Sequence, residues 1–190
     1  MNRINFLQVL ELGIRLNIFL KLMNYGIGKI LNGQFYLKDK LPEAIANIPL
    51  NQVDGYTLAW TFFGYSKGYI LFIGISQIIG ACLFIYNRTK IIGGLILLPI
   101  LLNIIVVDYF YGVAYGALFS AIFYLGGILW ILGRNWQRIQ KAILELLIKF
   151  SDSFNKINWK LYLLGVVVFI VVFIIEYYGI TLFGYEDRVM

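Results

Sequence analysis

The sequence predicts an all-α membrane protein, a polytopic helix bundle with a four-helix core, an interfacial amphipathic helix and a fifth transmembrane helix. Of the 190 residues, 61% are hydrophobic and 14% are charged, and the mean hydropathy is +0.79. Soluble domains are nearer half apolar and a quarter charged. Apolar runs of about 20 residues, the length that crosses a bilayer, recur along the chain. Little sequence remains between them for a soluble domain.

The first apolar segment, residues 10–31, is long enough to cross a bilayer but contains Arg15 and Lys21. Such a cation at the centre of a spanning helix costs about 2.5–3.5 kcal/mol, whereas each Leu, Ile or Phe returns about 0.3–0.6 kcal/mol. The net free energy of inserting this segment into a membrane is therefore close to zero. We therefore expect its polar side chains to face other helices or a water-filled cavity.

A linker at residues 32–66 follows, and its aromatic second half is too short to span, which favours an interfacial or re-entrant segment. Three further spans are predicted at residues 68–86, 91–108 and 113–132. The sequence DYFYG between the last two is a turn or a kink, at which Gly112 interrupts the helix.

Residues 134–150 have a different character, because apolar side chains recur at helical spacing while basic side chains fill the other face. This pattern is typical of an amphipathic helix on a membrane surface, or of a docking helix for a partner. Residues 161–180 form the last predicted span, which only Glu176 interrupts. The sequence thus divides into a core at 1–133, a basic interfacial segment at 134–160 and a carboxy-terminal helix and tail at 161–190.

The distribution of basic residues predicts the orientation of the helices. The more basic side of the predicted spans carries Arg3, Arg88, Lys90, Arg134, Arg138, Lys141, Lys149, Lys156 and Lys160, and the other side carries Lys38, Lys40, Lys67 and Arg188. The positive-inside rule then places the amino terminus in the cytoplasm and, with five spans, the carboxyl terminus outside a bacterial inner membrane. We assign the net charge of +6 to this topology and to anionic lipid rather than to nucleic acid.

The composition also narrows the chemistry. The chain has no histidine and one cysteine, Cys82, so neither an intrachain disulfide nor a CxxC redox pair can form. No cluster of metal ligands and no nucleophile–base pair is visible, so we assign no catalytic residue and no metal site. This pattern does not favour an enzyme that acts alone.

Polar residues inside the predicted spans are the candidates for function. On a helical wheel Glu11, Arg15 and Lys29 share one face of the first helix, while Lys21 and Asn24 lie on nearly the opposite face. Glu11 and Arg15 are four residues apart and can pair. We expect Lys29 to extend to the membrane interface and Arg15 and Lys21 to have buried partners. The carboxylates within predicted spans are Glu11, Asp108 and Glu176.

Two further patterns concern helix packing. Asn103 follows Pro99 by four residues and can bond across to another helix, and Asp108 is either a partner for an intramembrane cation or a turn residue. Gly112, Gly116 and Ser120 form a ladder of small residues at a spacing of four. Such a ladder favours close packing within the bundle, or alternatively a homo-oligomer interface.

Two stretches resemble the DoxX family of membrane proteins. The first is YGIGKILNGQF at residues 25–35, which Arg15 precedes, and the second is the block at residues 60–112, from WTFFGY to DYFYG. The similarity covers roughly residues 8–132. It implies a DoxX-like four-helix core, and it places Arg15, Lys29, Gln34, Asn103 and Asp108 at family-like positions. The family takes its name from a small subunit of a quinol-linked terminal oxidase and thiosulfate:quinone oxidoreductase.

The resemblance and the intramembrane polarity together predict an accessory or anchor subunit of a quinone-linked redox complex, partnered by an oxidoreductase subunit. Arg15, Gln34 and Asn103 would hold the quinone head group, and aromatic residues of TFFGY would cover its ring. Because the chain has no cysteine pair and no histidine, any electron transfer would have to use a bound quinone or cofactors held by the partner. The alternatives are a small transporter or channel, and a membrane scaffold or regulator that acts through the amphipathic helix.

Overall fold

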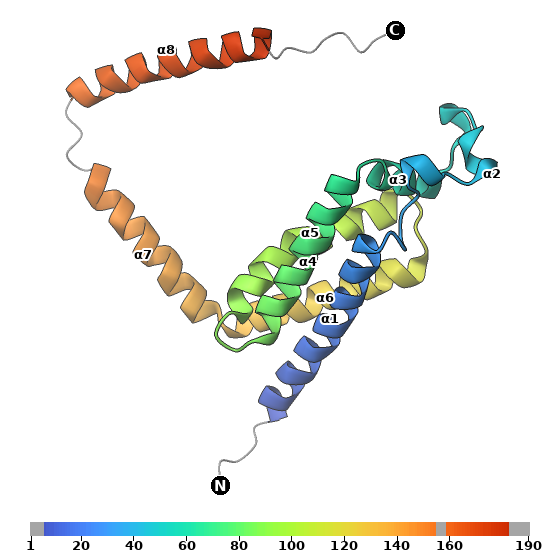
Figure 1. Cartoon of the computed structure of the whole chain (residues 1–190). Helices are drawn as coiled ribbons and strands as arrows, with labels where there is room; N and C mark the ends of the chain where they lie inside the picture. The colour runs from blue at the N-terminus through green and yellow to red at the C-terminus, as the bar shows by residue number, and fades with distance from the viewer. Residues whose placement is uncertain (1–5, 155–158, 183–190) are drawn as a thin grey trace. The chain divides into compact units, whose positions relative to one another are not determined.

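The computed structural model describes residues 6–154 and 159–182 (Figure 1). Every regular element in these ranges is helical, and no strand occurs in them. The long helices are α1 (Phe6–Ile30), α3 (Gly55–Gly64), α4 (Lys67–Ile85), α5 (Lys90–Phe110), α6 (Tyr115–Arg134), α7 (Trp136–Phe154) and α8 (Trp159–Leu182). Short helical turns lie between α1 and α3, at Lys38–Lys40, Glu43–Ala46 and Leu50–Gln52. The all-helical prediction is therefore confirmed for the described part of the chain.

Within the described residues, three helices, α4, α5 and α6, are long and apolar enough to cross a membrane. These helices correspond to three of the predicted spans and support association with a membrane. Helix α1 has 25 residues but is not in this group. Its length is sufficient, and its four charged side chains, Glu11, Arg15, Lys21 and Lys29, distinguish it from the others.

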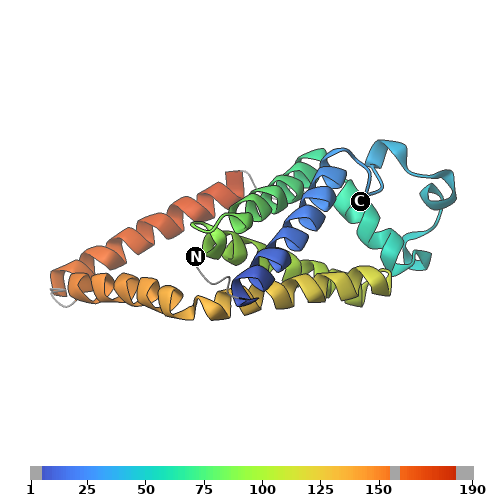
Figure 2. The same cartoon turned by 90° about the horizontal axis from the view of Figure 1, so that it is seen from below.

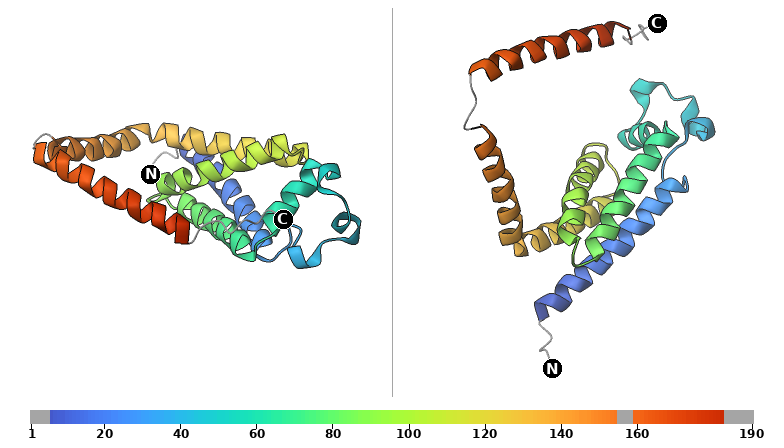
Figure 3. Two further views of the ribbon diagram at one scale, coloured as in Figure 1. Left: turned by 90° about the horizontal axis from the view of Figure 1, so that it is seen from above. Right: turned by 60° about the vertical axis from the view of Figure 1, so that its left-hand side comes forward.

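The chain divides into two compact units, Met1–Ile139 and Gln140–Met190. In the first unit α1 packs along α4, α4 along α5, and α5 along α6, as the views in Figure 2 and Figure 3 also show. Helices α1 and α6 meet at Gly127, which faces Ile14 and Ile18. The apolar core lies between these helices and includes Ile18, Leu22, Phe84, Leu97, Leu101 and Ile128.

The ends of these helices follow from local chemistry. The side chain of Asp54 accepts a hydrogen bond from the Thr57 amide at 3.1 Å and caps α3, and Ser66 caps α4 in the same manner through the amide of Tyr69. After α5 the backbone of Gly112 has a φ of 66°, a conformation that glycine adopts without strain. The end of DYFYG, at Tyr111 and Gly112, is thus a turn between α5 and α6, while its first three residues complete α5.

Close helix packing depends on glycines of α1, α4 and α5. At Gly26 an added Cβ would lie 3.2 Å from the carbonyl oxygen of Gly74, and at Gly74 it would lie 3.1 Å from that of Gly26. The ladder predicted for α6 is different. A Cβ at Gly112 or Gly116 would meet nothing within 4 Å, and the Ser120 hydroxyl bonds to the carbonyl of Gly116 in its own helix. The prediction that this ladder packs within the bundle is wrong, and its use between copies stays a prediction.

The second unit contains most of α7 and all of α8. The predicted amphipathic helix is present as α7, with its apolar Ile143, Leu146 and Leu147 exposed beside an exposed Lys141. Between Leu163 and Tyr178 α8 is apolar, and its side chains there, Glu176 included, are exposed. Arg3, Lys156 and Arg188, which contribute to the orientation argument, lie outside the described residues.

Candidate functional site

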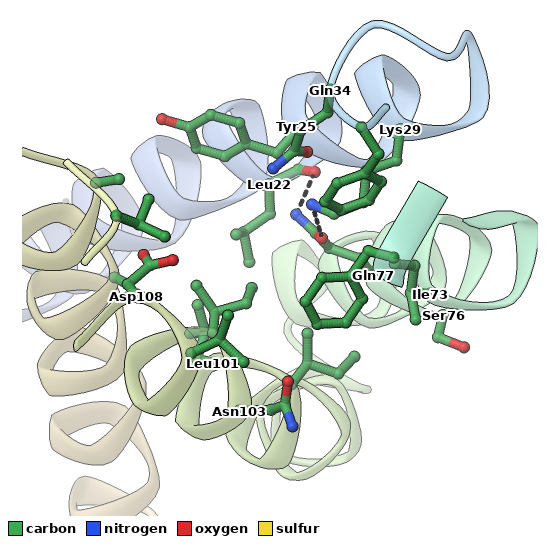
Figure 4. A pocket seen from close by; sticks show the side chains of 18 of the residues that line it. Leu22, Tyr25, Lys29, Gln34, Ile73, Ser76, Gln77, Leu101, Asn103 and Asp108 are labelled. Carbon is green, nitrogen blue, oxygen red and sulfur yellow. Dashed lines mark hydrogen bonds between the residues drawn. The ribbon is translucent and has the colours of Figure 1, made fainter. Parts of the chain in front are cut away.

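A cavity of about 570 Å³ lies within the first unit, at the end of the bundle that α3 covers. Helices α1, α3, α4, α5 and α6 all contribute to its lining, as does the segment that follows α1 (Figure 4). Aliphatic and aromatic side chains make up most of the wall. Besides the tyrosines at positions 25, 69 and 124, the polar side chains in it are Lys29, Gln34, Ser76, Gln77, Asn103, Asp108 and Ser120.

Lys29 and Gln77 form a buried polar pair on one wall. Lys29 is 6% exposed and Gln77 is 1% exposed. The Lys29 ammonium donates a hydrogen bond to Gln77 Oε1 at 3.1 Å, and Gln77 Nε2 donates to the carbonyl oxygen of Leu22 at 3.0 Å. An ammonium group has three protons, and the described residues accept one of them. The pair therefore presents a positive charge with further donors at the cavity.

Asp108 lies on another wall of the same cavity, in the last turn of α5. It is 7% exposed, and Figure 4 shows its carboxylate on the opposite side from Gln77. Its backbone carbonyl accepts a hydrogen bond from Val113 at 3.0 Å, which fixes the turn. In the part of the chain that the structure describes, no side chain or amide donates to the carboxylate, and no cation lies within 4.0 Å of it. Lys29 and Asp108 thus bring groups of opposite charge to the same cavity.

The aromatic part of the wall comes from α3 and from the segment after α1. The rings of Phe35 and Phe63 stack with centroids 5.4 Å apart, and Phe35 meets Trp60 edge to face at 5.6 Å. Gly64 lies against the backbone of Tyr36, which leaves no room for a side chain at that position. This contact holds α3 against the segment after α1. The predicted interfacial segment is thus a ten-residue helix at one end of the cavity.

Two of the three residues predicted to hold a ligand line this cavity. Gln34 is half-buried and Asn103 is exposed at the rim. Arg15 is not in the lining, so the prediction that these three residues share one pocket is wrong for Arg15. Its Nε donates to the carbonyl of Phe84 at 3.0 Å, and its other nitrogens contact the carbonyl of Ile85 and the side chain of Asn87. The last carbonyls of a helix lack partners within the helix, and a cation there is favourable.

Arg15 belongs to a charged cluster around Glu11. Its guanidinium lies 3.8 Å from the Glu11 carboxylate, which also contacts Lys90 and, at 3.6 Å, Arg134. The expected buried partner of Arg15 is confirmed. Lys90 begins α5 and Arg134 ends α6, so this cluster joins the start of α1 to two other helix ends. In the sequence, Lys90 and Arg134 stand at the ends of apolar segments, and this was the feature from which their contact with Glu11 could have been predicted.

Two further predictions concern α1. Lys21 and Asn24 are exposed, so the expectation of a buried partner for Lys21 is wrong. Lys29 does not extend to the interface but is buried against α4. The reason is that Lys29, Gly26 and Leu22 share the face that packs on α4, whereas Lys21 lies outside it. Gln77 was not identified from the sequence as a functional residue. Its position as a polar amide within the apolar stretch GISQIIG could have indicated a bond to another helix.

Comparison with known proteins assigns no ligand to this cavity. No family model matches the chain, and no solved structure matches it. The chain is 41% identical over 85 residues to the uncharacterized protein YwoB of Bacillus subtilis (strain 168). That alignment covers 45% of this chain and 51% of YwoB, so it spans about half the length of each protein.

Proposed function

We propose that this chain is a DoxX-like multi-pass protein of a bacterial inner membrane that binds the ring of a quinone in the cavity between α1, α4, α5 and α6. It would act as an accessory or anchor subunit of a quinone-linked redox complex. The observation that carries this proposal is the buried Lys29 ammonium, which supplies hydrogen-bond donors to an otherwise largely apolar and aromatic cavity.

The size and lining of the cavity suit such a ligand. Small-molecule sites commonly have volumes of about 300–1,000 Å³ and apolar walls with a few polar groups that orient the ligand. A quinone ring is flat and apolar, with two carbonyl oxygens that accept hydrogen bonds. Lys29 can donate to one of these oxygens, and the rings of Phe63 and Trp60 can cover the ring face.

The rim of the cavity supports access from the bilayer. Phe72 on α4 and Pro99 and Asn103 on α5 line the cavity and are exposed. These helices are candidate membrane spans, so exposed side chains within them face hydrocarbon when the protein is embedded. A lipid-soluble molecule would reach the cavity by this route without crossing water.

The role we propose is to hold the ring rather than to transfer electrons. The chain has no histidine and a single cysteine, so redox groups would belong to the partner oxidoreductase. In the proposed topology the amino terminus is cytoplasmic and the carboxyl terminus is outside. The cluster of Glu11, Lys90 and Arg134 would then lie on the cytoplasmic side, which agrees with the positive-inside rule.

The test is binding of duroquinone, a quinone without a lipid tail, to the full chain in lipid nanodiscs. Quenching of Trp60 fluorescence reports occupancy, and Trp60→Phe identifies its contribution. Lys29→Gln should weaken binding about tenfold or more, because a hydrogen bond to a charged group contributes about 1.5–3 kcal/mol. Lys21→Gln is the matched control, since Lys21 lies on the same helix but is exposed.

Equal affinities for the two lysine variants and the unaltered chain would overturn the proposal. A second readout is mild extraction of the chain from native membranes, followed by mass spectrometry of lipids and proteins. Quinone and an oxidoreductase subunit should accompany the chain. Extraction of the chain with neither of them would count against the accessory-subunit role.

One observation favours transport as a second candidate function. Lys29 and Asp108 bring opposite charges to one largely apolar cavity, and such residues mark ion and substrate pathways in membrane proteins. Flux of ions or small solutes through liposomes that contain the chain tests this alternative. Transport would be favoured over the accessory-subunit role if the unaltered chain showed flux but bound no quinone, and if Lys29→Gln abolished the flux.

A further inference from the structure

The carboxylate of Asp108 has no role in the proposal so far. It is 7% exposed, lines the cavity and receives no hydrogen bond from the residues that the structure describes. Its oxygens are open to the cavity, since no fully buried side-chain oxygen or nitrogen of the described residues lacks a partner. The carboxylate therefore offers an acceptor to a ligand that donates a hydrogen bond at this position.

The oxidised and reduced forms of a quinone differ in what they offer to such a group. The carbonyl oxygens of a quinone only accept hydrogen bonds. The hydroxyls of a quinol donate as well as accept. At Lys29 both forms find a donor, so that end of the cavity does not separate them strongly. At Asp108 a quinone carbonyl would face a carboxylate, and no hydrogen bond could form because both groups only accept. A quinol hydroxyl would instead donate a hydrogen bond to the carboxylate.

We propose that the cavity selects the reduced, hydroxyl-bearing form of the ring, with one oxygen accepting from Lys29 and the opposite hydroxyl donating to Asp108. This inference rests on the proposed function, because it concerns the redox state of the ligand in the same cavity. The two residues lie on different helices, α1 and α5, and face the cavity from different sides (Figure 4). In this proposal a ring with oxygens at opposite positions lies between them.

The test compares duroquinol with duroquinone, which share the same ring and methyl groups. Isothermal titration calorimetry with the full chain in nanodiscs, under anaerobic conditions, gives the dissociation constant of each. Duroquinol should bind at least tenfold more tightly, because a hydrogen bond to a carboxylate is charge-assisted. A tenfold preference also raises the midpoint potential of the bound two-electron couple by about 30 mV, which a redox titration measures independently.

The variant Asp108→Asn keeps the shape of the side chain but can donate to a carbonyl, so the preference for duroquinol should fall to about one. Asp39→Asn removes an exposed carboxylate outside the cavity lining and should leave the preference unchanged. Circular dichroism and thermal unfolding show whether Asp108→Asn is folded. The comparison of the two ligands on the unaltered chain does not depend on any variant.

The outcomes separate this inference from the function beneath it. Equal or tighter binding of duroquinone to the unaltered chain would overturn the selection of the reduced form while the quinone site stands. If neither compound binds above empty nanodiscs, the proposed function itself fails. A preference for duroquinol that survives in Asp108→Asn would show that Asp108 does not create it, which also overturns the inference.

Discussion

The ammonium of Lys29 in α1 and the side-chain oxygen of Gln77 in α4 lie 3.1 Å apart, although 48 positions separate them in the sequence. Gln77 also donates a hydrogen bond to the backbone carbonyl of Leu22, which precedes Lys29 on the same face of α1. One amide thus contacts α1 twice and holds Lys29 at the cavity. Because Gln77 is 1% exposed, water does not replace either contact.

Gln77→Leu should destabilise the bundle and displace Lys29. The substitution removes the acceptor of the buried Lys29 ammonium and the second donor of the Leu22 carbonyl, and an unsatisfied buried group costs about 1–3 kcal/mol. Ser76→Ala is the neighbouring control, because Ser76 is only half-buried. Thermal unfolding in detergent measures the difference. If the two variants unfold at the same temperature, the Lys29–Gln77 contact does not support the fold.

Gly26→Ala and Gly74→Ala should each loosen the crossing of α1 and α4. The new Cβ would lie 2.7 Å from Cγ1 of Ile78 at the first site and 2.9 Å from Cγ1 of Ile30 at the second. Overpacking of this kind costs about 1–3 kcal/mol. Gly116→Ala meets open space and should instead stabilise α6 by up to about 1 kcal/mol. Unfolding in mixed micelles distinguishes the opposite signs.

Glu11→Gln should destabilise the first unit by about 3 kcal/mol, because breaking a buried ion pair leaves an uncompensated buried charge. Here the carboxylate contacts Arg15, Lys90 and Arg134. Glu43→Gln is the control, since Glu43 is exposed. Titration with a denaturing detergent measures both midpoints. An unchanged midpoint for Glu11→Gln would show that the cluster contributes nothing to stability.

The cap of α3 should weaken in acid. The hydrogen bond from Thr57 holds the pKa of Asp54 below its usual value. A carboxylate with a lowered pKa stabilises the folded state above its unfolded pKa, near 4, and this contribution is lost as the pH falls through the lower folded value. The protection of the α3 amides from hydrogen exchange, taken relative to the intrinsic exchange rate at each pH, should therefore fall below about pH 4. Asp54→Asn keeps a cap without a charge and should remove this pH dependence.

The proposed orientation predicts which loops a membrane-impermeant maleimide can reach. Cys82 is the single cysteine, so Cys82→Ser provides a background without cysteine. On this background Lys40→Cys should react in intact cells, whereas Arg88→Cys should react only after the membrane is permeabilised. Both positions are exposed. The reverse pattern of labelling would contradict a cytoplasmic amino terminus.

Much of the helical framework could be predicted from the sequence, because apolar runs of spanning length have few other stable structures in a membrane. Residues 68–86, 91–108 and 113–132 each match a helix to within a few residues. The amphipathic pattern after residue 134 likewise matches α7. The role of Gly112 could not be predicted from the sequence, since a glycine suits either a turn or a kink. Its φ of 66° shows that it forms a turn.

The site was predicted less well, and α1 shows why. That Glu11, Arg15 and Lys29 share one face of a helix could be predicted from the sequence, because it follows from 3.6 residues per turn. The sequence did not determine that Arg15 and Lys29 serve different sites. At a rise of 1.5 Å per residue they lie about 21 Å apart along the helix. The tertiary structure decided which helix ends lie opposite each of them, so Arg15 joins the Glu11 cluster while Lys29 faces the cavity with Asp108.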